Sequence, residues 1–299
     1  MKFRGSLILL IVAIIWGTAF SAQRAGMDHI GPFAFNGIRF ALGCLSLLPL
    51  LYFLRRQKTP QTRRDDCRKA WRAGSVTGLI MLVDLSFQQV GLVYTTAGKA
   101  AFITCLYLIL VPLAGVFFHQ KVKGNVWIGA ILSLIGLYFL CVTDGFSLEY
   151  GDSIILGSAV FGALHILAIG YYARNVDWLE LACAQFFVCS VGSLLLAFFL
   201  ESFSWQAVSN AAIPILYGGI LSVGVAYTLQ IYGQKYADPT QAVIIMSLES
   251  VFGALSGYVF LDEILSFVQI GGCLLMLTGV IISQLSLLYR FSSTNRESV

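Results

Sequence analysis

The sequence predicts an all-α membrane protein in which ten transmembrane helices form two inverted five-helix repeats. Of its 299 residues, 58% are hydrophobic and 11% are charged, whereas a soluble domain carries about 25% charged residues. Apolar segments of about 20 residues, long enough to cross a bilayer as helices, recur along the whole chain. One segment also occurs twice, 142 positions apart, which indicates an internal repeat. The matching residues are Gln88 with Gln230, Gly91 with Gly233, and Tyr94 with Tyr236.

Five apolar segments in the first half are expected to be helices. Lys2 and Arg4 precede the first, and a basic stretch from Arg55 to Arg72 separates the second from the third. A polar break over residues 143–152 ends this half, so we place the repeats at residues 5–143 and 152–288. The expected helices are Gly5–Arg24, Phe33–Leu54, Ala73–Tyr94, Ala97–Phe118 and Gly124–Val142.

The first of these segments also has features of a secretory signal. Basic residues precede it, and Ala19-Phe20-Ser21 fits a signal-peptidase site. We expect the segment to be retained, because its removal would leave the sixth helix without a counterpart in the first half.

Five further apolar segments follow in the second half. Pro214 and the Gly218-Gly219 pair predict a break or kink near the start of the third of them. The expected helices are Ser153–Tyr172, Leu179–Leu200, Ala211–Gly233, Thr240–Phe260 and Phe267–Leu288.

The placement of lysine and arginine tests this count of ten. With a cytoplasmic N-terminus, sixteen of the 19 basic residues lie on the inner side, eight of them between the second and third helices. Arg24 and Lys99 lie outside, and Arg39 lies within a helix. This distribution follows the positive-inside rule, and it predicts a multi-pass protein of the cell (inner) membrane with both termini cytoplasmic.

An odd number of helices in each repeat gives the two repeats opposite orientations. Equivalent loops then lie on opposite faces, and their charges differ accordingly. The loop between the second and third helices holds eight basic residues, while its counterpart, Glu201–Asn210, holds none. Lys121 on the inner side likewise corresponds to Glu263 on the outer side. Secondary transporters use this inverted-repeat plan and bind substrate near the midplane, where the halves meet.

Several functional classes are not indicated. The seven cysteines include no Cys-x-x-Cys pair and no cluster with histidine, so neither a disulfide framework nor a metal site is expected. Phosphate loops, metalloprotease motifs and nucleophile elbows are also missing, so we expect no enzyme, no cofactor and no ATP hydrolysis. The basic inner loop is expected to contact anionic lipid rather than nucleic acid.

The order of several short motifs resembles the EamA-type members of the drug/metabolite transporter superfamily. The resemblance covers essentially the whole chain and implies ten helices in two inverted repeats. Two positions depart from the family pattern: Lys121 replaces the usual glutamate, and Ser250 replaces the proline that usually follows Glu249, which predicts a straighter ninth helix. The matching motifs are Trp16-Gly17-Thr18, Arg39-Phe40, Phe87–Leu113, Trp127-Ile128-Gly129 with Gly136, Ser247-Leu248-Glu249, Asp262-Glu263, and Gln269-Ile270-Gly271 with Gly279.

Four ionisable residues fall inside expected helices and are therefore candidates for function, because charge within a membrane is costly. Asp84 lies 12 residues after Arg72, about 18 Å into a core about 30 Å thick. Glu249 and His165 have similar depths, and Arg39 lies in the outer part of its helix. Alternatively, the acids and the histidine are hydrogen-bonded packing residues, and Arg39 extends to the outer surface to pair with a loop carbonyl.

Polar and aromatic residues add further candidates for substrate binding. Gln88 and Gln230 are related by the repeat, so they either bind a polar substrate from both halves or tie helices together. The aromatic candidates are Trp16, Tyr107, Tyr227 and Tyr232, which either form cavity walls or pack against lipid and protein. Small-residue motifs at Gly74-x-x-x-Gly78 and Gly253-x-x-x-Gly257 predict close helix contacts.

Glu249 is the favoured coupling residue. A carboxyl at mid-depth, in a chain without an ATP site, can load a proton and release it when the cavity opens to the other face. Asp84 is the rival, because it lies at similar depth in the other half. Protons are therefore a candidate coupling ion.

These features favour a secondary transporter, either an exporter or an exchanger, that moves a small metabolite such as an amino acid or drug-like compound by rocking of its two halves. The alternative is a non-transporting membrane sensor or partner subunit. An intramembrane enzyme would need paired catalytic groups, for which Asp84 and His165 are the one pair. The identity of the substrate and the oligomeric state, a homo-oligomer included, are left open.

Overall fold

The computed structural model describes residues 2–117, 122–141, 149–202, 204–260 and 264–296, all the elements of which are helical. The predicted contrast between Lys121 and Glu263, and most of the break between the halves, fall outside these residues. The first-half helices are α1 (Lys2–Met27), α2 (Pro32–Arg56), α3 (Pro60–Val93), α4 (Ala97–Thr104), α5 (Tyr107–Phe117) and α6 (Gly124–Cys141). The second-half helices are α7 (Tyr150–Tyr172), α8 (Trp178–Leu200), α9 (Trp205–Asn210), α10 (Ala212–Leu216), the π-helix η1 (Tyr217–Tyr227), α11 (Thr228–Gln234), α12 (Pro239–Met246), α13 (Glu249–Phe260) and α14 (Phe267–Arg296).

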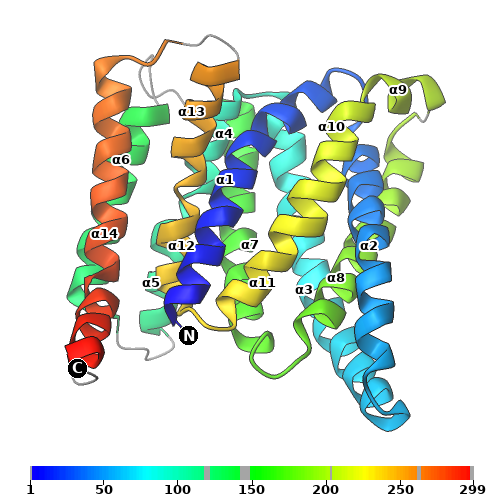
Figure 1. Ribbon diagram of the computed structural model, residues 1–299. Helices are drawn as coiled ribbons and strands as arrows, with labels where there is room; N and C mark the ends of the chain where they lie inside the picture. Colours follow the sequence, from blue (N-terminus) through cyan, green and yellow to red (C-terminus); the bar gives the residue numbers. More distant parts are fainter. Residues whose placement is uncertain (1, 118–121, 142–148, 203, 261–263, 297–299) are drawn as a thin grey trace.

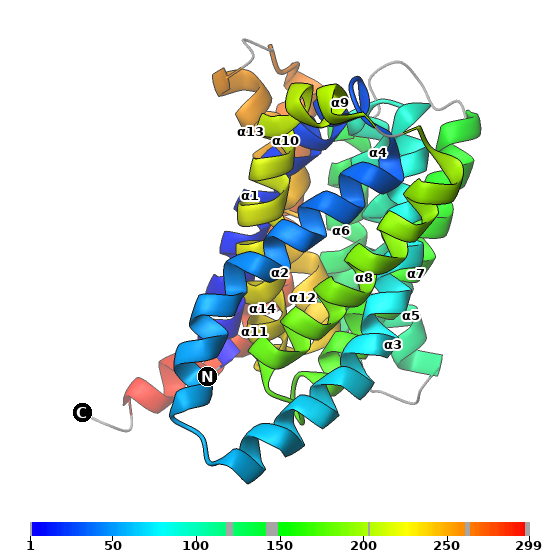
Figure 2. The ribbon, with the colours of Figure 1, turned by 90° about the vertical axis from the view of Figure 1, so that its right-hand side faces the viewer.

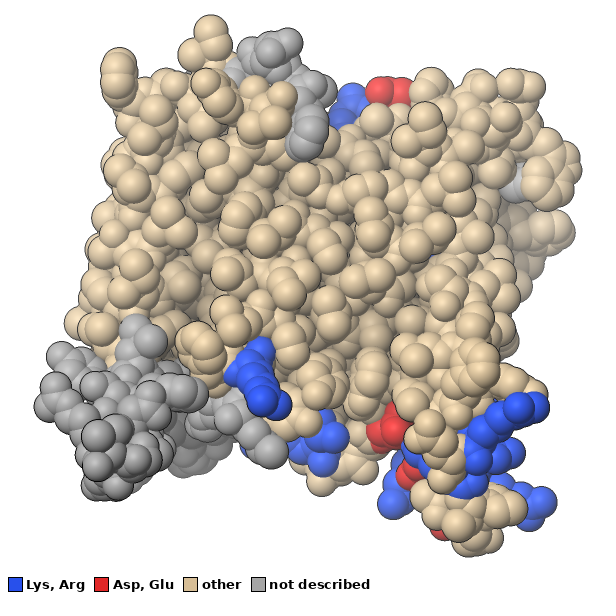
Figure 3. All heavy atoms as spheres, in the orientation of Figure 1, with Lys and Arg blue, Asp and Glu red and all other residues tan. Residues whose placement is uncertain are grey.

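The long helices run side by side as a bundle, with the start of α1 and the end of α14 at the same end (Figures 1 and 2). Nine segments among the described residues are long and apolar enough to cross a membrane. The tenth predicted crossing, Thr240–Phe260, corresponds to α12 and α13, which are 8 and 12 residues long. On the face shown in Figure 3, charged side chains gather at the two ends and leave a broad uncharged band between them.

The basic stretch before the third crossing was predicted to be a loop, but most of it is a helical extension of that crossing. α3 begins at Pro60 and runs for 34 residues, and its first turns extend past the neighbouring helices (Figures 1 and 2). Thr59 caps this helix by accepting a hydrogen bond from the Thr62 amide, and proline occupies the first turn. Arginine and lysine are good helix formers in water, so the charge does not prevent the extension.

The fourth and ninth predicted helices are both interrupted. α4 ends at Thr104 and α5 begins at Tyr107, while α12 ends at Met246 and α13 begins at Glu249. The ninth helix is therefore interrupted although Ser250 replaces the usual proline. At this break Leu248 N bonds to Ile245 O, and Ser247 Oγ bonds to Ile244 O, so the chain closes a tight turn without a proline.

The predicted break near Pro214 takes another form. The chain stays helical through this region, but residues Tyr217–Tyr227 form a π-helix that contains the Gly218-Gly219 pair. π-Helical turns occur often at functional sites, and this one lies beside α1 and α2.

Helix packing joins the two halves of the chain throughout the bundle. α2 packs along α8, α3 packs along α7 and α8, α6 packs along α14, and α1 packs against η1, α11 and α13. The Gly74-x-x-x-Gly78 motif makes the predicted close contact: a Cβ at Gly74 would lie 2.4 Å from the Ala184 Cβ on α8. On α13, Gly253 meets Gly17 of α1.

Candidate functional site

One cavity in the middle of the bundle collects residues from both halves of the chain. It encloses about 560 Å³ of space between protein atoms, open solvent at its mouth included. Nine of the ten candidate residues line it: Trp16, Arg39, Asp84, Gln88, Tyr107, His165, Tyr227, Gln230 and Glu249. They come from α1, α2, α3, α5, α7, η1, α11 and α13.

Glu249 lies at the helix break and meets its own repeat counterpart. It is 4% exposed and is the first residue of α13, where the positive end of the helix dipole favours a carboxylate. The Tyr107 hydroxyl donates to Glu249 Oε1 at 3.0 Å, across an interval of 142 residues. The Cys105 thiol donates to the same oxygen at 3.2 Å. The two interrupted helices therefore place a carboxyl, a phenol and a thiol at one point.

Asp84 also lines the cavity, and it joins α3 to α7. The Ser158 hydroxyl donates to Asp84 Oδ1 at 2.6 Å. His165 instead makes a 3.2 Å hydrogen bond with the Gln185 side chain. The two residues therefore line the same cavity but bond to different partners, and the pair that an intramembrane enzyme would need is not hydrogen-bonded.

Arg39 is buried rather than extended to the outer surface. Its side chain is 1% exposed, and its guanidinium carbon lies 5.4 Å from the centre of the Phe35 ring and 5.3 Å from that of Phe40. Arg39 Nε donates to Asn36 Oδ1 at 3.0 Å. The alternative interpretation, in which Arg39 pairs with a loop carbonyl, is therefore wrong.

The two repeat-related glutamines both reach the cavity. Gln88 comes from α3 and Gln230 from α11, and both are buried. The Gln230 Oε1 acceptor has no hydrogen-bond partner within the described chain. An unpaired buried acceptor is costly to a folded protein, and a ligand that donates a hydrogen bond would satisfy it.

Aromatic rings form part of the cavity wall. The centres of the Trp16 and Tyr227 rings are 4.7 Å apart, and Trp16 Nε1 donates to the Ser222 carbonyl of the π-helix. Tyr232, the fourth aromatic candidate, is not among the lining residues. The centre of its ring lies 5.2 Å from that of the Trp178 ring.

Several lining residues escaped the sequence analysis. The polar ones are Gln23, Thr104 and Ser222, and the Gln23 and Thr104 side-chain oxygens have no hydrogen-bond partner among the described residues. Gln23 lies beside Arg24 at the end of an expected helix, where no local pattern marks it as a cavity residue. Thr104 and Ser222 are small polar residues of a kind that is common in membrane helices.

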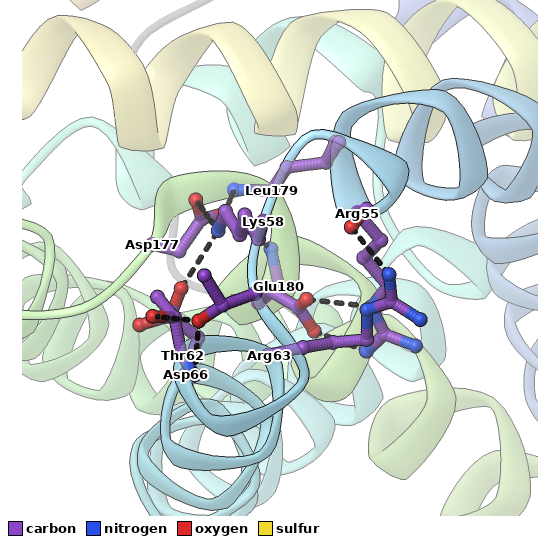
Figure 4. Close-up of polar contacts among 9 residues, drawn as sticks. Arg55, Lys58, Thr62, Arg63, Asp66, Asp177, Leu179 and Glu180 are labelled. Carbon is purple, nitrogen blue, oxygen red and sulfur yellow. Dashed lines mark hydrogen bonds and ion pairs between the residues drawn. The ribbon is translucent and has the colours of Figure 1, made fainter.

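A second polar cluster lies at the end of the bundle where α2 meets α3 (Figure 4). Arg55 pairs with both carboxylate oxygens of Glu180, which is itself buried. Lys58 Nζ lies 2.7 Å from Asp66 Oδ2 and 2.8 Å from Asp177 Oδ2. The cluster therefore fastens α2 and the helical extension of α3 to the start of α8.

These ion pairs shift the pKa of both Lys58 and Asp177. Burial acts to lower the pKa of Lys58, but its hydrogen bonds to Asp177 and Asp66 outweigh burial and raise it. Burial acts to raise the pKa of Asp177, but the Lys58 ammonium and the amides of α8 lower it. Both groups are therefore held in their charged forms around neutral pH.

At its other end, α2 is also fastened to α8. Glu201, just past the end of α8, accepts hydrogen bonds from the Phe33 and Ala34 amides at 2.8 and 2.9 Å. A carboxylate at a helix N-terminus is favourable because it satisfies free amides. The α2–α8 pair is thus fixed at both ends.

Comparisons with known proteins agree with this architecture. The sequence model of the EamA-like transporter family matches the chain twice, over residues 3–142 and 149–285. An uncharacterized transporter of Archaeoglobus fulgidus is 34% identical over 281 residues, which cover 93% of this chain and 84% of the relative. The uncharacterized transporter YvbV of Bacillus subtilis is 27% identical over 297 residues, covering 93% and 91%. A solved crystal structure has the same fold, with a TM-score of 0.76, 20% identity, and coverage of 97% of this chain and 99% of the other.

Proposed function

The chain belongs to the EamA-like transporter family, and we propose that it is a secondary transporter that carries a small polar metabolite by alternating access. One observation supports this proposal above the others. Two carboxyls, a guanidinium and an imidazole, all costly to bury in a membrane, line a single cavity between helices of both halves. An ordinary packing core would not bring them together.

The arrangement of ten crossings in two inverted repeats is part of the proposal. The breaks in the fourth and ninth crossings occur 142 positions apart, and Tyr107 meets Glu249 across the same interval. A contact between equivalent residues is expected near a two-fold axis. The start of α1 and the end of α14 lie at one end of the bundle (Figure 1), which supports an even number of crossings.

The packing also suggests which helices move together. α1 packs with η1, α11 and α13, while α7 packs with α3, α4 and α5. Each group combines helices from both halves of the sequence, whereas α2 and α8 are fastened to each other at both ends. We therefore place the rocking motion between these two groups, and not between the two halves of the sequence as expected from the repeat alone.

Transport energy is proposed to come from an ion gradient, with Glu249 as the proton-carrying group. Glu249 lies in the cavity at a helix break, where movement of α13 would change its distance from Tyr107. Discontinuous helices place ion and substrate sites in this way in other transporters. The inner, basic end of the bundle is taken as cytoplasmic, with the termini there and the protein in the cell (inner) membrane.

The decisive experiment measures transport by the purified protein in proteoliposomes, using a panel of labelled amino acids, organic acids and amines. We expect gradient-driven movement of at least one class. In that assay Glu249→Gln is expected to keep substrate exchange but to lose its response to a pH gradient. Full gradient-driven transport by Glu249→Gln would contradict the assignment, and loss of the response in Asp84→Asn alone would move the role to Asp84. Ligand binding without any transport would favour a membrane sensor.

A further inference from the structure

The feature that carries a further inference is the buried guanidinium of Arg39 in the cavity wall. Its side chain is 1% exposed, yet its Nη2 atom has no hydrogen-bond partner in the described chain. A buried donor without a partner is costly, so proteins rarely keep one unless a ligand, an ion or an ordered water completes it. The residue also lines the cavity directly.

The surroundings of Arg39 hold the guanidinium in one orientation. Asn36 sits one turn away on α2 and accepts the Arg39 Nε–H through Oδ1 at 3.0 Å. The Asn36 amide nitrogen in turn donates to the Leu85 carbonyl of α3 at 3.0 Å. The rings of Phe35 and Phe40 lie against the guanidinium. Nε is thus occupied by the protein, while Nη2 is left for another acceptor.

The rest of the cavity offers the opposite chemistry. Glu249 and Asp84 supply carboxyls, and within the part of the chain that the structure describes the side-chain oxygens of Gln23, Thr104 and Gln230 have no hydrogen-bond partner. The cavity therefore presents a fixed cationic donor together with several acceptors, of which the Asp84 carboxyl interacts electrostatically with Arg39. A ligand with an oxyanion at one end and hydrogen-bond donors at the other would satisfy both sets.

From this arrangement we infer that Arg39 is the anion-binding subsite of the transport cavity and binds the carboxylate of the substrate. Asn36 is the residue that positions the Arg39 guanidinium. This inference rests on the proposed function, because it names the class of solute that the cavity carries. A guanidinium fits a planar carboxylate in a way that a lysine would not. Asn36 acts only through Arg39, since its own polar atoms are used by Arg39 and Leu85.

The test uses the purified full-length protein in lipid nanodiscs and two probes of matched shape, sodium propanoate and uncharged propanamide. Their apparent affinities are read from the rise in the thermal unfolding midpoint with probe concentration, with sodium chloride as the ionic-strength control. We expect propanoate to stabilise the protein at concentrations at which propanamide has little effect. Arg39→Gln is expected to weaken propanoate binding about tenfold or more, because a charge-assisted hydrogen bond is lost.

Two further variants separate binding from general damage. Arg24→Gln, which makes the same change at an exposed arginine paired with Asp28, should leave propanoate binding unchanged. Asn36→Ala keeps the charge but frees the guanidinium, so it should lower the ratio of propanoate to propanamide affinity. A purely structural role for Asn36 would lower stability and leave that ratio unchanged, which would contradict the positioning role.

Other outcomes would overturn the inference. Equal effects of propanoate and propanamide on the unchanged protein would refute it even if Arg39→Gln failed to fold. Stronger stabilisation by inorganic phosphate than by propanoate would contradict the carboxylate assignment and indicate that Arg39 binds a phosphate group. The test of the subsite can be distinguished from the test of the proposed function. Transport of amines without any effect of propanoate would refute the subsite alone. Propanoate binding through Arg39 in a protein that transports nothing would refute transport alone.

Discussion

Replacing Gly17 by alanine tests the closest helix contact beside the cavity. A Cβ at this position would lie 2.5 Å from the Glu249 carbonyl oxygen, 2.7 Å from the Gly253 nitrogen and 2.8 Å from the Phe252 Cβ. None of these atoms is the end of a flexible side chain. They belong to the first turns of α13, so α1 and α13 must separate to admit the methyl group.

Two opposing effects set the size of the change. Overpacking of this kind costs about 1–3 kcal/mol, while alanine gains up to about 1 kcal/mol over glycine in a helix. Because backbone atoms cannot rotate away, we take the upper part of the first range and expect Gly17→Ala to lower the free energy of unfolding by about 1–2 kcal/mol. The shift should also move Glu249 relative to Tyr107, and transport should fall with it.

The assay is thermal unfolding of the purified protein in detergent, in which each kcal/mol corresponds to about 2–4 °C for chains of somewhat smaller size. We therefore expect the midpoint of Gly17→Ala to fall by about 2–8 °C. The matched control is Gly271→Ala in α14, where an added Cβ meets nothing within 4 Å. That variant should be as stable as the unchanged protein or slightly more so. A Gly17→Ala midpoint equal to or above that of the unchanged protein, or an equal loss in Gly271→Ala, would refute the reasoning.

Three further predictions concern topology, the cavity and the ion-pair cluster. A reporter active only in the cytoplasm should give a signal when fused after Lys58 and none after Ser204; a signal at the second position would contradict the inverted arrangement. Gln88→Leu and Gln230→Leu should each weaken substrate binding in a proteoliposome competition assay while the protein stays folded, and unchanged binding in both would indicate packing roles. Asp177→Asn keeps the helix cap but removes the charge beside Lys58, so at neutral pH it should cost less than about 1 kcal/mol, because the pair is partly exposed. Since the pKa of Asp177 is lowered by folding, its contribution is present above its unfolded pKa of about 3.9 and disappears as the pH falls through the folded value. The two proteins should therefore converge in stability in acid, and a difference that persists there would contradict the ion-pair origin.

The class of the protein and its candidate residues could be predicted from the sequence because both depend on local properties. A segment of about 20 apolar residues must become a helix in a bilayer, whatever its neighbours are, since its backbone has no other way to satisfy its hydrogen bonds. A charged residue inside such a segment is costly wherever it lies, so Asp84, Glu249, His165 and Arg39 stood out without knowledge of the fold. That these four residues line one cavity depends on the packing of α2, α3, α7 and α13, which only the structure shows.

Tertiary structure alone decided the features that depend on distant partners. Ser250 in place of proline predicted a straighter ninth helix, yet in the packed structure this helix is interrupted between Met246 and Glu249. The Arg55–Glu180 ion pair joins residues 125 positions apart, and no local pattern marks either as the other's partner. Arg39 was expected either to face the outer surface or to serve the cavity, and the choice between them came from Asn36 and two phenylalanine rings that hold it inside. The chemistry of a side chain determines how costly it is to bury, but only the packed helices determine which partners offset that cost.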